Sequence, residues 1–164
     1  MVPVVAFIGH HESGKTTLLT RLISTLVERG YRVGTVKHAP HEDELDHPDK
    51  DSSRHRAAGA DQTLVVGETG YALFWEDVID EPIERVIERL FPEYDIVLAE
   101  GFKHGSFPKI EVYRRLNTRA EPLAGEIDVV AVITVEHVAL PDGVKVFSPR
   151  HLEKIADFLE EKFL

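Results

Sequence analysis

The chain has 164 residues, of which 43% are hydrophobic and 29% charged, and its formal net charge is −10 at pH 7. This length suits one domain with a substantial core, and we expect a single nucleotide-binding domain over residues 1–164. The acidic balance argues against nonspecific nucleic-acid binding and membrane docking, the apolar runs are too short to span a bilayer, and the absence of cysteine excludes disulfides and thiolate metal sites.

The first predicted element is a strand that leads into a phosphate-binding loop. Residues 9–16 spell G-x-x-x-x-G-K-T between an apolar run and a helical pattern, where backbone N–H groups bind phosphates. Gly14 lets the backbone approach the phosphates, Lys15 reaches the β- and γ-phosphates, and the Thr16 hydroxyl binds Mg²⁺. Because it is negative, Glu12 is expected to point to solvent or to a partner's cation. The predicted nucleotide contacts are Gly9, His10, His11, Glu12, Ser13, Gly14, Lys15, Thr16 and Thr17.

Helix and strand patterns then alternate along the chain. The first helix is predicted to stop at Gly30, and its apolar residues recur at helical spacing: Leu18, Leu19, Leu22, Ile23, Leu26 and Val27. Strands are predicted over 31–37, 94–99, 109–113, 128–134 and 144–147, and a hairpin over 62–66 and 71–75. Further helices are predicted from Asp51-Ser52 to near Gly59, from Pro82 to Leu90, and from Ser148-Pro149 onward.

This order of elements predicts an α/β fold of the P-loop nucleoside triphosphatase type, with a mostly parallel sheet flanked by helices and an additional β-hairpin. Ligands of such a sheet bind beyond the carboxyl ends of its strands, where the loop 9–16 lies. The hairpin is expected to extend the sheet at one edge, and pairing in a homodimer would cover that edge.

An acidic residue, Glu100, follows the strand 94–99. Phosphoryl-transfer sites use such a carboxylate to hold magnesium opposite the loop threonine. Glu100 and Lys15 are therefore the predicted catalytic residues, and Thr16 and Glu100 the predicted metal ligands. Lys37, at the end of the second strand, is expected to meet a phosphate or a carboxylate.

The loop 38–51 combines three histidines with six carboxylates. Such a set could bind zinc or nickel, although its spacing matches no defined site. We favour a switch-like segment that is ordered by the magnesium nucleotide, with Asp51 as a further metal ligand.

A basic strip, residues 102–119, stands out in this acidic chain. It is interpreted as a second anionic site or a surface for an acidic partner, and the alternative is a solvated strand face. Since Arg114 lies on the opposite strand face from Lys109, we favour Lys103 and Lys109 acting together. The strip has one acid, Glu111, and its cations are Lys103, Lys109, Arg114, Arg115 and Arg119.

Three segments together resemble a known family: GHHESGKTT (9–17), DHPDKDSSRHRAAGA (46–60) and DIVLAEGFKHGSFPKIEV (95–112). They resemble the MobB family of molybdopterin-guanine dinucleotide biosynthesis proteins, in order and over the whole chain. The resemblance implies a cytoplasmic, homodimeric P-loop protein that binds GTP. It also implies a role in assisting a molybdopterin guanylyltransferase of the MobA type, which attaches a guanylyl group to molybdopterin.

The base preference and the reaction are less well defined by the residues themselves. The Asn-Lys-x-Asp guanine motif is absent from the sequence, and residues 134–136 occupy a base-pocket position only by analogy of fold. No arginine finger can be identified near the loop 9–16, so slow, magnesium-dependent GTP hydrolysis is expected. A P-loop small-molecule kinase and a nickel-delivery GTPase are the alternatives.

Overall fold

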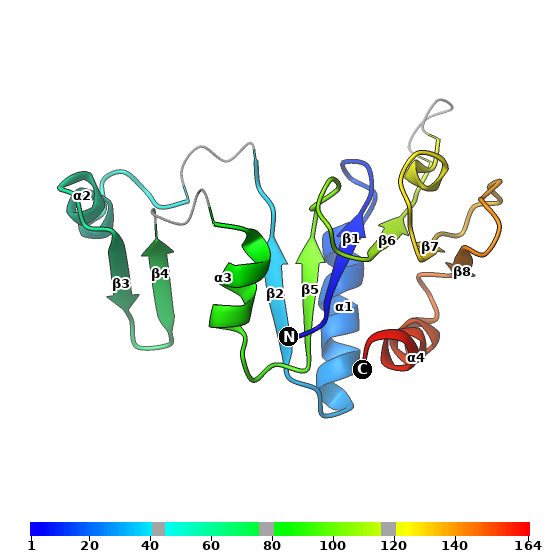
Figure 1. Cartoon of the computed structure of the whole chain (residues 1–164), viewed down its shortest axis with the longest axis horizontal. Coiled ribbons are helices and arrows are strands. Elements are labelled where there is room, and N and C mark those ends of the chain that lie inside the picture. Colours follow the sequence, from blue (N-terminus) through cyan, green and yellow to red (C-terminus); the bar gives the residue numbers. More distant parts are fainter. Residues whose placement is uncertain (41–44, 76–80, 116–120) are drawn as a thin grey trace. The chain divides into compact units, whose positions relative to one another are not determined.

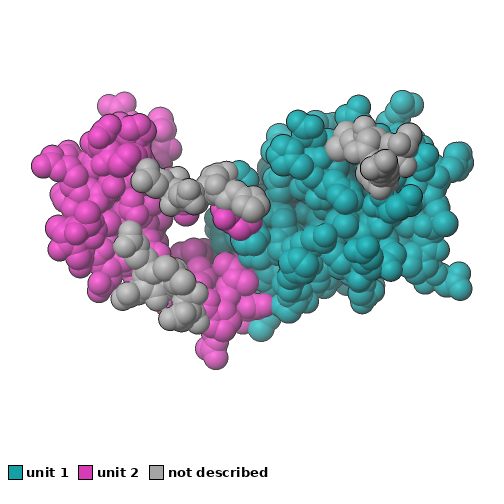
Figure 2. All heavy atoms as spheres, turned by 90° about the horizontal axis from the view of Figure 1, so that it is seen from above, with its two compact units in different colours: residues 1–38, 91–164 teal, residues 39–90 magenta. Residues whose placement is uncertain are grey.

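The computed structural model describes residues 1–40, 45–75, 81–115 and 121–164. The chain forms two compact units, residues 1–38 with 91–164 and residues 39–90, which Figure 2 colours separately. The single domain over residues 1–164 stays a prediction. His41 and Arg119, which belong to the predicted histidine-rich loop and basic strip, lie outside the described residues.

The first unit is built on a six-stranded parallel sheet in the order β2-β5-β1-β6-β7-β8 (Figure 1). The predicted strands are confirmed, and β1 lies between β5 and β6, where the strand order reverses. The carboxyl end of β1 is therefore the switch point at which such sheets bind ligands. The strands are β1 (Val4–Ile8), β2 (Val33–Lys37), β5 (Ile96–Glu100), β6 (Lys109–Val112), β7 (Ala131–Ile133) and β8 (Lys145–Phe147).

One face of this sheet packs against α1 (Lys15–Glu28) and α4 (Leu152–Phe163). Apolar residues on both faces of β1 and β5 are fully buried, which explains why these strands read as continuous apolar runs. Of the apolar residues at helical spacing in α1, four leucines are buried and Ile23 is partly buried, whereas Val27 is 54% exposed. Each helical residue turns about 100°, so Val27 points away from the stripe that ends at the buried Leu26.

The second unit contains α2 (Asp51–Ala57), β3 (Gln62–Val66), β4 (Tyr71–Trp75) and α3 (Ile83–Leu90). The predicted hairpin is confirmed, with Leu64 opposite Leu73. Its expected place at the edge of the main sheet is wrong, because β3 and β4 pair with each other as a separate two-stranded sheet. The strands close locally through a bond from the Gly67 N–H to the Gly70 carbonyl (2.9 Å).

Two helix starts differ from their predictions. Lys50, rather than Asp51-Ser52, caps α2, because the Ser52 hydroxyl donates instead to the Asp46 carboxylate (2.7 Å). The helix α4 begins at Leu152, past the predicted Ser148-Pro149, because the Ser148 hydroxyl accepts the Arg150 N–H (3.3 Å) in a turn. Within the described ranges, no helix is both long and apolar enough to cross a membrane.

Candidate functional site

The loop 9–14 joins the switch-point strand β1 to α1 and depends on two glycines for different reasons. Gly14 caps α1 in a left-handed conformation (φ 91°, ψ 16°), with no side-chain bond to the cap from the described residues. The first-turn N–H groups of α1 are thus directed to a ligand rather than to a capping side chain. At Gly9 the constraint is space, since a Cβ would lie 2.4 Å from the Val112 carbonyl oxygen of β6.

The ammonium of Lys15 lies within the concave loop. Its Nζ donates to the carbonyl oxygens of His10 (2.7 Å) and Gly9 (3.1 Å) and to the Ser13 hydroxyl (3.4 Å). Burial lowers the pKa of Lys15, while the negative charge of Glu100 opposes this shift. A cation desolvated among carbonyl oxygens gains strongly from an anion, so this geometry suits phosphate.

The structure brings together Thr16 and Glu100, which are 84 positions apart in sequence. The Thr16 hydroxyl, at the start of α1, donates to Glu100 Oε1 at the end of β5 over 2.7 Å. A hydroxyl and a carboxylate are hard oxygen ligands, which Mg²⁺ binds together with water and phosphate oxygens. These two residues therefore fit a magnesium ion that is completed by a nucleotide.

A small hollow of about 150 Å³ borders the Thr16–Glu100 pair. Lys37 also lines it, and its backbone pairs with Glu100 across β2 and β5. The backbone of Lys37 therefore lies beside that of Glu100 at this sheet edge, while the expected contact of its ammonium with a carboxylate stays a prediction. Whether Lys37 meets a phosphate stays a prediction.

Backbone strain follows directly after Glu100. Gly101 and Phe102 both have positive φ angles, 93° and 57°. For a bulky residue such as phenylalanine this conformation costs about 1–2 kcal/mol. The Phe102 ring stacks on His38 (5.0 Å between centroids) and meets Phe107 edge-on (5.8 Å). These aromatic contacts fix the turn that follows Glu100.

The variable positions of the loop have different surroundings. His10 Nε2 donates to the Glu121 carbonyl oxygen (3.0 Å), which assigns the ring proton to Nε2. Ser13 is buried, and Glu12 is exposed as expected. His11 and Thr17 are also exposed. The nucleotide contacts predicted for the whole loop stay predictions.

Three further predicted residues, Asp51, Lys103 and Lys109, have local surroundings of their own. Asp51 belongs to the second unit, where it pairs with Arg54 (3.6 Å), and its role as a metal ligand stays a prediction. Lys103 is exposed, whereas the Lys109 ammonium donates to the carbonyls of Gly105 (2.7 Å) and Phe107 (3.0 Å). Lys109 therefore stabilises its own loop. Across the described residues, no three His, Cys, Asp or Glu side chains form a metal cluster.

In the sequence Glu111 stands out only as the one acid of the basic strip, yet in the structure it is fully buried. Its carboxylate accepts the N–H groups of Leu123 (2.8 Å) and Ala124 (2.9 Å) at the start of a 3₁₀ helix, η1 (Leu123–Gly125). This holds the segment that also offers the Glu121 carbonyl to His10. A lone acid between apolar neighbours in a buried strand was the available signal.

The sheet order, the glycine-dependent loop and the lysine within it define a P-loop protein of the nucleoside triphosphatase fold. The comparisons with known proteins are more specific. Residues 4–135 match the family described as molybdopterin guanine dinucleotide synthesis protein B, or MobB. The chain belongs to this family, which places it in the biosynthesis of the molybdenum cofactor.

Relatives agree over nearly the whole chain. An Escherichia coli (strain K12) protein named molybdopterin-guanine dinucleotide biosynthesis adapter protein is 37% identical, covering 98% of this chain and 93% of that protein. A Haemophilus influenzae protein of the same name is 31% identical, covering 97% and 88%. The crystal structure of Bacillus subtilis MobB has a TM-score of 0.75 at 27% identity, covering 99% and 98%.

Proposed function

We propose that this protein is a GTP-binding accessory protein in molybdopterin guanine dinucleotide formation. In this role it assists the attachment of a guanylyl group to molybdopterin by a molybdopterin guanylyltransferase of the MobA type. The family membership and the adapter names of the relatives support the pathway. The observation that carries nucleotide binding is the Lys15 ammonium, held inside the loop beside the Thr16–Glu100 pair.

Magnesium-dependent GTP hydrolysis, at a low rate, is part of this proposal. Thr16 and Glu100 would hold Mg²⁺, which supplies positive charge against the phosphates when bound. Lys15 adds a second positive charge and orients the phosphates. The family role requires GTP binding and contact with a partner, so slow turnover by the chain alone is compatible with it.

We also propose that the protein is a cytoplasmic homodimer and that Lys103 contributes to a second anionic site, for molybdopterin phosphate or for the partner. The sequence favours Lys109 as a second residue of this anionic site, acting together with Lys103. Since the Lys109 ammonium already bonds two carbonyls of the 105–107 turn, Lys109 contributes there mainly by shaping the loop that carries Lys103.

The decisive experiment measures GTP and ATP affinities, with and without magnesium, for the wild type and for Lys15→Ala. A hydrogen bond to a charged group contributes about 1.5–3 kcal/mol, and Lys15 is expected to make more than one to the phosphates. We therefore expect Lys15→Ala to weaken GTP binding by at least about a hundredfold. Calorimetric titration measures the change.

The matched control is Lys154→Ala, which removes an exposed lysine of α4 and should leave the GTP affinity unchanged. Circular dichroism establishes that both variants are folded. A folded Lys15→Ala protein with near-normal GTP affinity would contradict the proposal.

A further inference from the structure

A second hollow lies at the same sheet edge as the phosphate-binding loop. It has a volume of about 550 Å³, is bordered by the carboxyl ends of β7 and β8, and lies in the first unit. One strand, β6, separates β7 from β1, so at about 4.8 Å per strand the hollow begins about 10 Å from the loop strand. A nucleotide held by its phosphates at β1 spans such a distance. The lining residues are Thr134, Val135, Glu136, His137, Val146, Phe147, Ser148 and Arg150.

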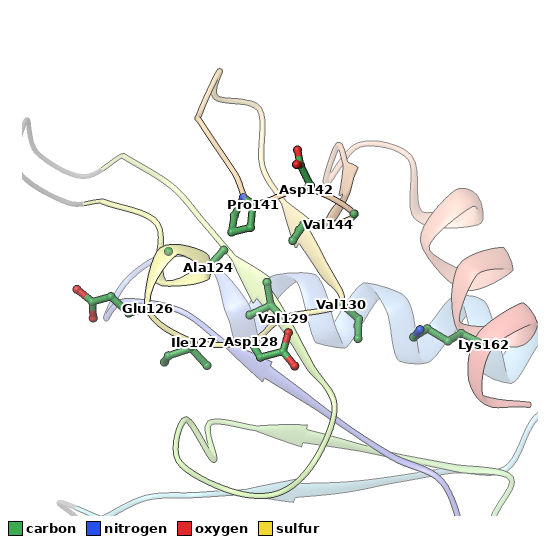
Figure 3. Close-up of a pocket in the computed structure, with 12 residues that line it drawn as sticks. Ala124, Glu126, Ile127, Asp128, Val129, Val130, Pro141, Asp142, Val144 and Lys162 are labelled. Carbon is green, nitrogen blue, oxygen red and sulfur yellow. The ribbon is translucent and has the colours of Figure 1, made fainter.

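Strand direction distinguishes this hollow from another one beside the same two strands. The other, of about 460 Å³, is formed by segments that precede β7 and β8, together with Lys162 of α4 (Figure 3). It therefore lies at the amino ends of the strands, whereas a phosphate bound at the loop 9–14 lies at the carboxyl ends. Only the hollow at the carboxyl ends can share a ligand with the loop.

Glu136 is the carboxylate in this hollow, and its backbone position is fixed. The buried Thr134 hydroxyl accepts the Glu136 N–H (3.0 Å), and the Thr134 N–H donates to the Phe147 carbonyl of β8 (2.8 Å). The turn that carries Glu136 is thus tied to the sheet. From this fixed backbone position the Glu136 carboxylate offers two acceptor oxygens to the hollow.

Glu121 interacts with the loop, and Arg115 interacts electrostatically with a residue of the hollow. His10 of the loop bonds the Glu121 carbonyl, and Arg115 follows β6, the strand between β1 and β7. The Tyr113 hydroxyl raises the pKa of Arg115, and the charges of Glu136 and Glu121 add to this shift. The negative charge of Glu136 thus acts on Arg115, which follows the strand between the loop strand and the hollow.

We propose that the hollow beyond β7 and β8 is the base subsite of this protein and that Glu136 selects guanine by accepting its N1–H and its 2-amino group. The proposal rests on nucleotide binding at the loop 9–14. Guanine offers two adjacent donors, N1–H and the 2-amino group, to one carboxylate. Adenine offers only its 6-amino donor, and the lone pair of its neighbouring N1 acceptor repels the carboxylate. Ser148 and Arg150 also line the hollow and supply donors that suit the O6 carbonyl of guanine but not the 6-amino group of adenine.

The test is Glu136→Gln, which keeps the shape of the side chain and exchanges one acceptor oxygen for an amide donor. Affinities are measured for GTP, ATP, xanthosine triphosphate and inorganic tripolyphosphate. We expect the variant to lose at least about tenfold in GTP affinity and to gain affinity for xanthosine triphosphate, because xanthine carries a carbonyl in place of the 2-amino group. Tripolyphosphate affinity should not change, since tripolyphosphate lacks a base.

The matched control is Glu126→Gln, which alters an exposed carboxylate in the hollow at the amino ends and should change none of these affinities. If tripolyphosphate and GTP bind the wild type normally but Glu136→Gln keeps the preference for GTP over ATP, the base subsite is wrong while the proposed function stands. If the wild type binds neither GTP nor tripolyphosphate, the proposed function fails and this inference fails with it.

Discussion

The motif of the phosphate-binding loop predicts which side chains are needed there, but not the tertiary contacts that constrain individual residues. The placing of Lys15, Thr16 and Glu100 at one sheet edge could be predicted, because the proposed phosphate and magnesium chemistry requires such side chains together. The space around Gly9 could not, because the Val112 carbonyl that limits it belongs to a strand about a hundred residues further along the chain. The strained Phe102 was also missed, since its conformation is fixed by ring contacts with His38 and Phe107.

Glu12 carries two costs that a nucleotide-binding loop would be better without. Its φ angle is 60°, which favours glycine, and its charge lies in a loop that is proposed to hold a triphosphate. At about 8 Å and an effective dielectric near 20, each like-charge pair costs about 2 kcal/mol, and salt reduces this at an exposed site. We therefore expect Glu12→Gly to tighten GTP binding by roughly three- to tenfold, measured by calorimetric titration.

Glu12→Ala separates the two causes, because it removes the charge and keeps the unfavourable backbone angle. It should recover the gain in affinity but not the gain in thermal stability that glycine gives. Weaker GTP binding in both variants would show that Glu12 contacts the ligand favourably.

Glu100→Gln tests the metal side of the site. The glutamine can still accept the Thr16 hydroxyl, and the backbone N–H groups of the loop are unchanged, so GTP binding should largely persist. The loss of one negative ligand, or of its orienting effect on a metal-bound water, should lower magnesium-dependent hydrolysis by about 10–100-fold. A phosphate-release assay over a magnesium series measures this, and an unchanged rate with unchanged magnesium dependence would make Glu100 a simple strand terminus.

Among the secondary-structure elements, type and order were predictable, whereas helix starts were not. Strands such as β1 and β5 can be recognised from their continuous apolar sequence, because both faces of a central parallel strand are buried. The starts of α2 and α4 were wrong because Ser52 and Ser148 bond to nearby groups instead of capping a helix. Ser148 also lines the hollow beyond β8, so the missed helix start lies at a site with a proposed function.

Glu111 joins two elements, the strand β6 and the short helix η1. Its two charge-assisted bonds contribute about 1.5–3 kcal/mol each, and glutamine could keep only one of them. We expect Glu111→Gln to lower the free energy of unfolding by about 2 kcal/mol, or the Tm by about 4–8 °C. Thermal unfolding measures the shift, and Glu161→Gln, at an exposed position of α4, is the control. Equal stability of the two variants would contradict a capping role for Glu111.

For the whole molecule, the sequence could predict the α/β class but not the separate sheet of the hairpin. The alternation of apolar strand segments with amphipathic helix segments identifies the α/β class, because the spacing of apolar residues reflects burial within each element. The pairing partner of an isolated hairpin depends on contacts that periodicity does not encode. The hairpin nevertheless offers a candidate surface for the proposed homodimer.

One face of the hairpin is occupied within its own unit, where Arg56 of α2 lies over the Phe74 ring (4.9 Å) and Thr63 is buried. The other face is exposed and apolar. Its exposed apolar side chains are Leu64 (58% exposed), Val66 (66%), Tyr71 (78%) and Leu73 (44%), while Trp75 at the end of the same face is covered by Arg89 of α3 (3.9 Å). A two-stranded sheet is marginally stable alone, and an apolar patch on an exposed sheet marks an interaction surface. A second copy of the chain, with its identical face, would cover this patch about a two-fold axis.

We therefore expect the wild type to be a dimer at micromolar concentration and Leu64→Lys combined with Tyr71→Glu to be a monomer. The two positions are diagonal neighbours on the exposed face, and their opposite charges avoid repulsion within the hairpin. Val27→Lys, which places a charge on an exposed apolar position of α1, should remain dimeric. Sedimentation equilibrium gives the masses. Because the loop 9–14 belongs to the first unit, the monomeric variant should still bind GTP. A monomeric wild type, or a double variant that stays dimeric, would remove the hairpin face as the site of self-association.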